Sequence, residues 1–185
     1  MLVETEHTPN PDTLKFLPGK KVSEAGPMEF LKNDKNIKIS LANKILSLDG
    51  TVMVFFGEDF ITVKKEKNLH WDNLKHGIIS EINDFYSSGN EVVVKKDFNK
   101  KTNDKPSENK DLVIDKINEV LDSKVRPAVA RDGGDITFKT FKNGVVTVEL
   151  KGSCSGCPSS VMTLKNGVQN LLCHYIPEVK SVEAV

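Results

Sequence analysis

The sequence of 185 residues lacks several features that would place it in a specialised class. It contains only two arginines, and its 26 basic residues are balanced by 26 acidic ones, so the formal net charge is zero. A nucleic-acid-binding protein usually carries a clustered excess of positive charge, so no nucleic-acid partner is expected. No apolar run approaches the ~20 residues that cross a bilayer, so no membrane association is expected either.

Cysteine is also scarce, with three residues in the chain. A small and odd number argues against a disulfide framework and favours a reducing compartment. The stretch MLVETEHTPNPD has neither the apolar segment of a signal peptide nor the Arg-rich composition of a transit peptide. We therefore expect a cytoplasmic, bacterial-type protein. The alternative is a mitochondrial matrix protein whose presequence is absent.

One polar stretch divides the chain. Residues 97–111 read DFNKKTNDKPSENKD and contain a single aromatic residue. Such a segment buries too little apolar surface to offset the entropy lost on ordering, which is typical of a flexible linker. We expect a first domain over 1–96, a linker over 97–110 and a second domain over 111–185.

The first half has apolar segments sufficient for a core of its own. From Trp71 to Phe85 the apolar positions recur every three or four residues, which predicts a helix. The segments VMVFF and FITVK flank Gly57, Glu58 and Asp59, which predicts a hairpin. A strand is also expected at 13–17, and short helices are expected at 27–31 and 41–48.

The second half predicts the order α-β-β-α-β. A helix begins near Asp111 and is ended or kinked by Pro127. Two strands flank an Asn-Gly turn, a second helix begins at Pro158, and residues 179–185 form an edge strand. The expected fold class is therefore α+β, with two small α+β domains joined by a polar linker.

The motif GSCSGCPSS places Cys154 and Cys157 in a Gly/Ser turn between a strand and a helix. Two intervening residues let both sulfurs face one point, and a helix N-terminus favours thiolate over thiol. We therefore expect two exposed, readily deprotonated thiols that act as a metal ligand pair or as a redox couple. The chain beyond Cys157 has room for one helix and one strand, which makes a thioredoxin-like dithiol oxidoreductase the weaker alternative.

A metal at this turn would need ligands from elsewhere. Iron–sulfur clusters and structural zinc both take four ligands, commonly thiolates. Cys173 lies ~24 Å beyond Cys157 along a regular helix and cannot close the same site. His174 is too distant for the same reason, and His7, His70 and His76 lie in the other half and show no ligand spacing. The missing ligands are therefore expected from a second copy of the chain in a symmetric dimer, with either iron or zinc allowed.

The turn Asp132-Gly133-Gly134-Asp135 precedes the hairpin. Its carboxylates are poor partners for thiolate-bound iron. We interpret the turn as structural, with paired glycines that redirect the chain from helix to strand and aspartates that cap amides.

At these residues the chain resembles a known family. RPAVARDGGDITF (126–138), VVTVELKG and CSGCPSS resemble the C-terminal domain of NifU and of the Nfu iron–sulfur scaffold proteins. TPNPDTLKFLPG (8–19) and VFFGEDFITVKK (54–65) resemble the N-terminal domain of the same Nfu proteins, so the resemblance covers nearly the whole chain.

The resemblance implies a non-enzymatic carrier that receives a [4Fe-4S] cluster from an upstream donor and delivers it to apo-proteins. The cluster would be shared between two subunits, and the family's ligand cysteines fall on Cys154 and Cys157. A zinc-stabilised dimeric adaptor remains the alternative from another class.

The role of the first domain is not given by these motifs. Both sulfur ligands lie beyond the linker, so residues 111–185 are expected to assemble a cluster alone. The first domain would then hold a client on a flexible tether and raise its local concentration. The alternative is that the first domain covers the cluster and is needed to retain it.

Overall fold

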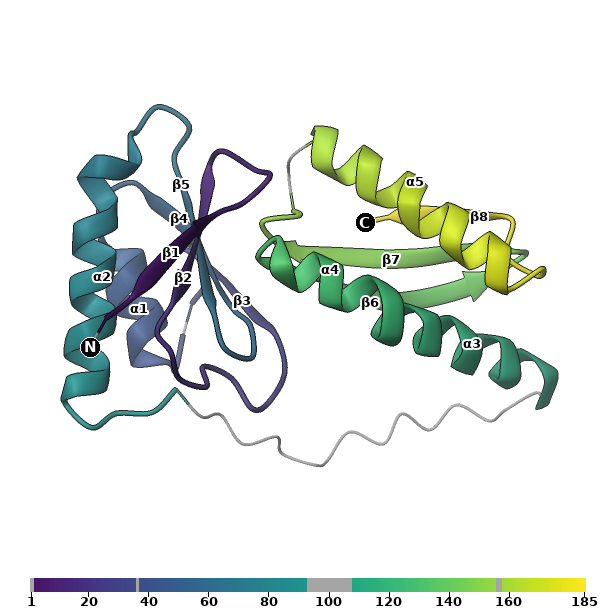
Figure 1. Cartoon of the computed structure of the whole chain (residues 1–185), viewed down its shortest axis with the longest axis horizontal. Helices are drawn as coiled ribbons and strands as arrows, with labels where there is room; N and C mark the ends of the chain where they lie inside the picture. The colour runs from purple at the N-terminus through teal and green to yellow at the C-terminus, as the bar shows by residue number, and fades with distance from the viewer. Residues whose placement is uncertain (1, 36, 93–107, 156–157) are drawn as a thin grey trace.

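The computed structural model describes residues 2–35, 37–92, 108–155 and 158–185. It contains two α+β units side by side (Figure 1), which confirms the expected fold class. Of the linker expected over 97–110, residues 97–107 lie outside the described residues. The last three belong to α3, which begins at Glu108.

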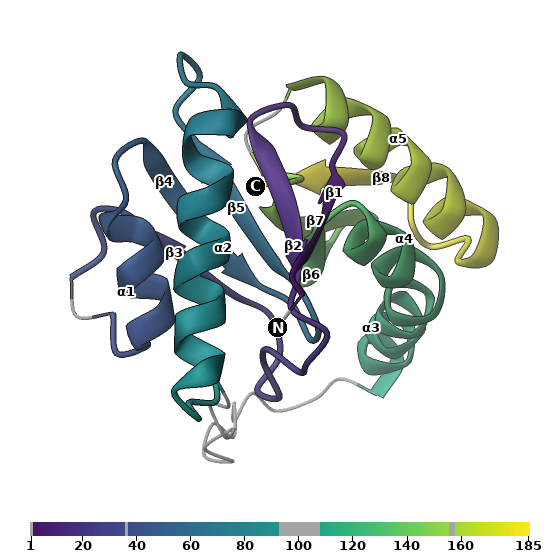
Figure 2. The same cartoon turned by 60° about the vertical axis from the view of Figure 1, so that its left-hand side comes forward.

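The N-terminal unit is a five-stranded antiparallel sheet with two helices on one face (Figure 2). The strand order is β1-β2-β5-β4-β3, and the first core cluster lies between the sheet and the helices. The helical stripe from Trp71 and the hairpin around Gly57 are confirmed. The elements are β1 (Glu4–His7), β2 (Thr13–Leu17), β3 (Met28–Leu31), α1 (Ser40–Ser47), β4 (Thr51–Phe56), β5 (Ile61–Lys65) and α2 (Trp71–Ser87).

Two strands of this sheet differ from the sequence-based expectation. The helix predicted over 27–31 is wrong, because Met28–Leu31 pairs with β4 as an edge strand. A single turn after Pro27 is too short to hold a helix by itself, whereas pairing satisfies its backbone and sets Phe30 against Phe56, 5.7 Å between ring centroids. Strand β1 was not predicted because its residues, ETEH, show no apolar alternation.

The C-terminal unit has the predicted order α-β-β-α-β. Its elements are α3 (Glu108–Val120), a π-helical turn (Leu121–Val125), α4 (Arg126–Arg131), β6 (Gly134–Lys142), β7 (Val145–Gly152), α5 (Pro158–Tyr175) and β8 (Ser181–Ala184). The sheet order is β6-β7-β8, and β8 pairs in parallel with β7 at the edge. The helices and the sheet enclose a second core cluster centred on Ile117, Leu121, Ile136, Val146 and Leu172.

Pro127 does not end the first helix of this unit. The π-helical turn precedes it, and Pro127 lies at the first turn of α4, where a missing N–H is tolerated. The helix therefore continues to Arg131 and delivers the chain to the Asp132–Asp135 turn.

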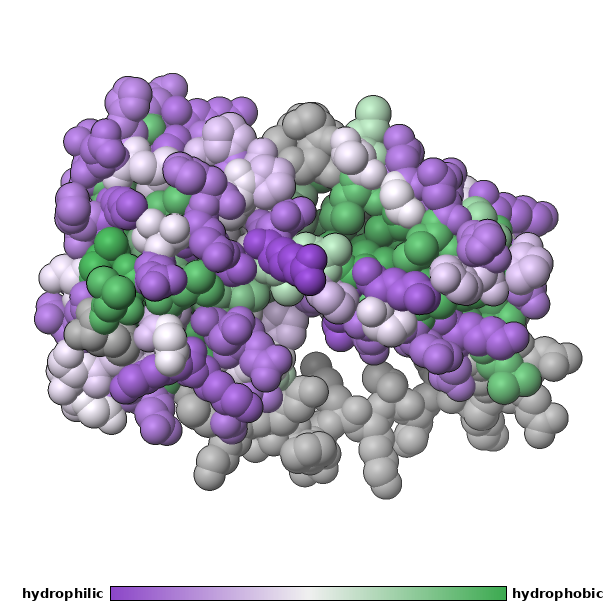
Figure 3. Space-filling model, in the orientation of Figure 1, coloured by the Kyte–Doolittle hydropathy of each residue, from purple (hydrophilic) through white to green (hydrophobic). Residues whose placement is uncertain are grey.

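Some apolar side chains of the C-terminal unit remain exposed at the surface. Figure 3 shows an apolar area beside α5, while hydrophilic residues dominate the visible face of the N-terminal unit. The partly buried residues that pack against the second core include Val113 of α3 and Val161, Leu164 and Leu171 of α5. Among the helices of the described ranges, none has the length and apolar content needed to traverse a membrane.

Candidate functional site

The cysteine motif begins where β7 ends. Gly152 has a positive φ of 67°, which lets the chain leave the strand in a direction that other residues rarely adopt. The next amide, of Ser153, donates to the carbonyl of Gly133 at 3.1 Å. Ser155 then folds back, and its amide donates to the carbonyl of Gly152 at 3.1 Å. The loop is therefore a tight turn fastened to the Asp132–Asp135 turn.

Gly134 makes room for the first cysteine. A Cβ atom added at Gly134 would lie 2.8 Å from Cys154 Sγ and 2.6 Å from the carbonyl oxygen of Lys151. Both separations are far inside van der Waals contact, so only glycine fits beneath this thiol. The reading of the paired glycines as a helix-to-strand turn is confirmed, but their contact with the cysteine was missed. The glycine doublet was the only sequence signal for it.

Cys154 is buried, with 5% of its surface exposed. Burial raises the pKa of its thiol to about 11; the neighbouring Ser153 hydroxyl opposes the shift, and Asp132 and Asp135 add to it. The expectation of an exposed, readily deprotonated thiol is therefore wrong for Cys154 in this conformation. Its side chain packs into the C-terminal core, and removal from water disfavours the charged thiolate.

The other half of the motif, Cys157, lies outside the described residues, so its expected exposure stays a prediction. Cys173 is half-buried in α5 against the C-terminal core. All four histidines are exposed. Within the described ranges, no group of three or more Cys, His, Asp or Glu side chains converges on one point. The described part of one chain therefore does not itself assemble a closed metal site.

The carboxylate of Asp135 forms an ion pair with Arg126. Its Oδ1 lies 3.2 Å from Nε of Arg126, which also donates to the carbonyl of Ile136 at 3.1 Å. Burial raises the pKa of Asp135, and the Arg126 guanidinium opposes this. The pair fastens α4 to the start of β6 and so fixes the turn under Cys154.

Comparison with known proteins matches each of the two units to a protein family. A family model described as the NifU-like domain matches residues 117–183, and one described as scaffold protein Nfu/NifU N terminal matches residues 3–89. The human mitochondrial NFU1 iron-sulfur cluster scaffold homolog is 45% identical over 186 residues, covering 100% of this chain and 72% of its own length. The chain belongs to the Nfu-type iron–sulfur scaffold family.

Two further relatives extend the comparison. The mitochondrial NifU-like protein 4 of Arabidopsis thaliana is 43% identical, and the match covers 99% of this chain and 65% of that protein. A solution structure of a NifU-like protein from Saccharomyces cerevisiae is 27% identical, covering 52% of this chain and 87% of the other, with a TM-score of 0.47. A TM-score at that level does not by itself establish a shared fold.

The expected bacterial-type cytoplasmic location is wrong. The Nfu relatives from human, Arabidopsis and Drosophila persimilis are all mitochondrial proteins by name. The expectation rested on an N-terminus without a transit peptide, and that observation does not separate a cytoplasmic chain from the mature part of an imported one.

Proposed function

We propose that this Nfu-type chain carries a [4Fe-4S] cluster between two copies of itself and transfers it to apo-proteins. Cys154 and Cys157 of each copy are the proposed ligands. The observation that supports this most is the cysteine loop itself, because a glycine-lined turn holds Cys154 inside a NifU-like domain. Thiolates are the usual ligands of such clusters.

Ligand counting supports the sharing. A four-iron cluster takes four protein ligands, and the motif offers two sulfurs per chain. The described residues add no third ligand nearby. A two-fold symmetric pair of chains supplies four thiolates from one motif, with the cluster on the axis.

The proposed role is a carrier's rather than an enzyme's. A cluster held by two sulfurs per chain can be passed on by ligand exchange, in which a client thiolate replaces one of the carrier's thiolates at iron. The partners are then an upstream cluster donor and apo iron–sulfur clients. We place the chain in the mitochondrial matrix; its relatives are named as mitochondrial proteins.

Cluster transfer tests this proposal. The chain is reconstituted without oxygen, identified by visible absorption and by iron and sulfide analysis, and mixed with an apo-enzyme that needs a [4Fe-4S] cluster. We expect client activity to return faster than with equal free iron and sulfide. The Cys154→Ala/Cys157→Ala chain is the matched control and should give only the slow, free-iron rate.

Two results would contradict the carrier role. One is purified protein that retains zinc and excludes iron, which fits the dimeric adaptor. The other is a loaded chain that reactivates the client no faster than free iron and sulfide.

A further inference from the structure

We propose that the outer face of the N-terminal sheet is an intramolecular docking surface for the cysteine loop and caps it until a cluster is loaded. This inference rests on the proposed function, because it takes Cys154 as a ligand that must reach a second chain. The occupant of the surface is the C-terminal unit of the same chain.

The docking surface is a row of side chains across four strands. Lys15 of β2 is opposite Thr62 of β5, Thr62 is opposite Phe55 of β4, and Phe55 is opposite Glu29 of β3. Their neighbours along the strands belong to the core under α1 and α2. Because successive side chains on a strand point to opposite faces, this row lies on the face away from the helices.

One end of the row contacts the turn under Cys154. Thr62 Oγ1 donates to the carbonyl of Gly133 at 2.8 Å, and Thr62 is completely buried. Lys15 Nζ donates to the carbonyl of Arg131 at 3.4 Å, although lysine is rarely buried. The approach is close, since a Cβ atom added at Gly133 would lie 2.8 Å from Thr62 Oγ1.

The other end of the row contacts the start of the cysteine loop. The Gly152 amide donates to Oε2 of Glu29 at 2.7 Å. Phe55 lies directly over the same residue, 3.1 Å from where a Cβ of Gly152 would be. Phe55 also joins Met53 and Phe60 in a third apolar cluster that Ala130 of α4 packs against. The junction, meaning the contact between the outer sheet face and the C-terminal unit, therefore has an apolar centre and polar edges.

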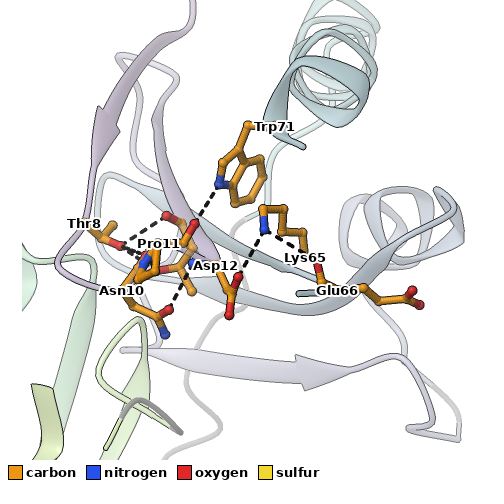
Figure 4. Close-up of polar contacts among 8 residues, drawn as sticks. Thr8, Asn10, Pro11, Asp12, Lys65, Glu66 and Trp71 are labelled. Atoms are coloured by element: carbon orange, nitrogen blue, oxygen red, sulfur yellow. Dashed lines mark hydrogen bonds and ion pairs between the residues drawn. The ribbon is translucent and has the colours of Figure 1, made fainter. Parts of the chain in front are cut away.

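A third contact comes from the β1–β2 loop, whose internal hydrogen bonds are shown in Figure 4. Asn10 donates from Nδ2 to the carbonyl of Ser153 at 3.2 Å and is itself buried. Its position is prearranged, because the Asp12 amide donates to its Oδ1 at 3.0 Å and Trp71 Nε1 donates to the adjacent Pro11 carbonyl at 3.1 Å. The loop thus presents Asn10 in a fixed orientation.

These contacts hold the residues on both sides of Cys154. Asn10 binds the carbonyl of Ser153, and Lys64 Nζ donates to the carbonyl of Ser155 at 3.4 Å. On the C-terminal unit these polar contacts are made to main-chain atoms, so the surface recognises the folded shape of the loop. A cluster shared by two chains needs Cys154 from both at one point, where the partner's loop would compete with this sheet face. Docking of the cysteine loop on the sheet face therefore opposes cluster loading.

The test measures access to Cys154 in the full-length apo chain. Thr62→Arg places a long side chain between the sheet face and the cysteine loop. Glu29→Lys replaces the acceptor of the Gly152 amide with a positive charge, and residue 29 is partly exposed, so the sheet should tolerate the change. Iodoacetamide labelling, assigned to Cys154 by fragment mass spectrometry, should be about tenfold faster in each variant, because opening the loop no longer breaks these hydrogen bonds. Thr140→Arg, at an exposed β6 position, is the matched control and should label like the unmodified chain.

Hydrogen exchange of the Gly152 amide gives a second readout that does not depend on the thiol. The amide should be protected in the unmodified chain and in Thr140→Arg, and should exchange about tenfold faster in Thr62→Arg and Glu29→Lys. Unchanged labelling and unchanged exchange in both junction variants would overturn the cap. Because neither readout needs iron, a chain with a working cap that never binds a cluster would disprove the proposed function alone.

Discussion

Cys154→Ala and Cys157→Ala are each expected to abolish stable cluster binding, whereas Cys173→Ala keeps the cluster. Losing one thiolate per chain removes two of the four ligands of a shared cluster, which leaves iron exposed to solvent and to chelators. Iron and sulfide per chain, measured after gel filtration without oxygen, should fall to background in the first two variants and stay at the unmodified level in the third.

Cys173→Ala is a well-matched control for Cys154→Ala. Both cysteines contact the C-terminal core, Cys154 buried and Cys173 half-buried, so each substitution should lower the free energy of unfolding by about 1 kcal/mol or less, with the larger loss for Cys154→Ala. A difference in iron content then reports ligation rather than folding. Equal loss of iron from Cys173→Ala would contradict the assignment of the ligand pair.

Gly152→Ala is expected to destabilise the apo chain by roughly 2 to 3 kcal/mol. The residue has φ at 67°, and an added Cβ would lie 2.6 Å from the carbonyl oxygen of Gly133 and 3.0 Å from Cα of Gly134. These neighbours are backbone atoms that cannot rotate away, so the β7 end or the turn beneath Cys154 must shift. Denaturant unfolding of the apo protein measures the effect without any iron.

Gly167→Ala provides the opposite outcome from the same chemical change. Gly167 is exposed in α5, and an added Cβ would meet nothing within 4 Å. Alanine is favoured over glycine in a helix, so this variant should be more stable by about 0.5 to 1 kcal/mol. If Gly152→Ala were as stable as Gly167→Ala, Gly152 would not be closely packed against the backbone of Gly133 and Gly134.

The regular elements were the predictable part of this fold. The apolar stripe from Trp71 and the strand pair around Asn143 and Gly144 each carry a local periodicity or turn signal, and both appear in the structure. The edge strands β1 and β3 carry no such signal. They exist because the neighbouring strands offer unpaired backbone groups, which is a property of the sheet and not of their own residues.

The candidate site was predictable in its residues but not in its environment. Cys154 was identified from the spacing of the motif, yet the motif does not show that its side chain packs over Gly134 and into the C-terminal core, or that a distant sheet face holds the loop around it. Lys15 and Thr62 lie in predicted strands and Glu29 in a segment predicted as a helix, so nothing in the sequence is a reason to group them. Only their register across the sheet brings them together against the cysteine loop.

The central claim is that one cluster is shared by two chains, and a combined mass and metal measurement tests it most directly. Light scattering of the reconstituted protein, with iron and sulfide assays on the same fractions, should give a dimer that carries about one four-iron cluster per two chains. Removing the iron should shift the protein toward monomer. A monomer that is fully loaded with its own four-iron cluster would contradict the account.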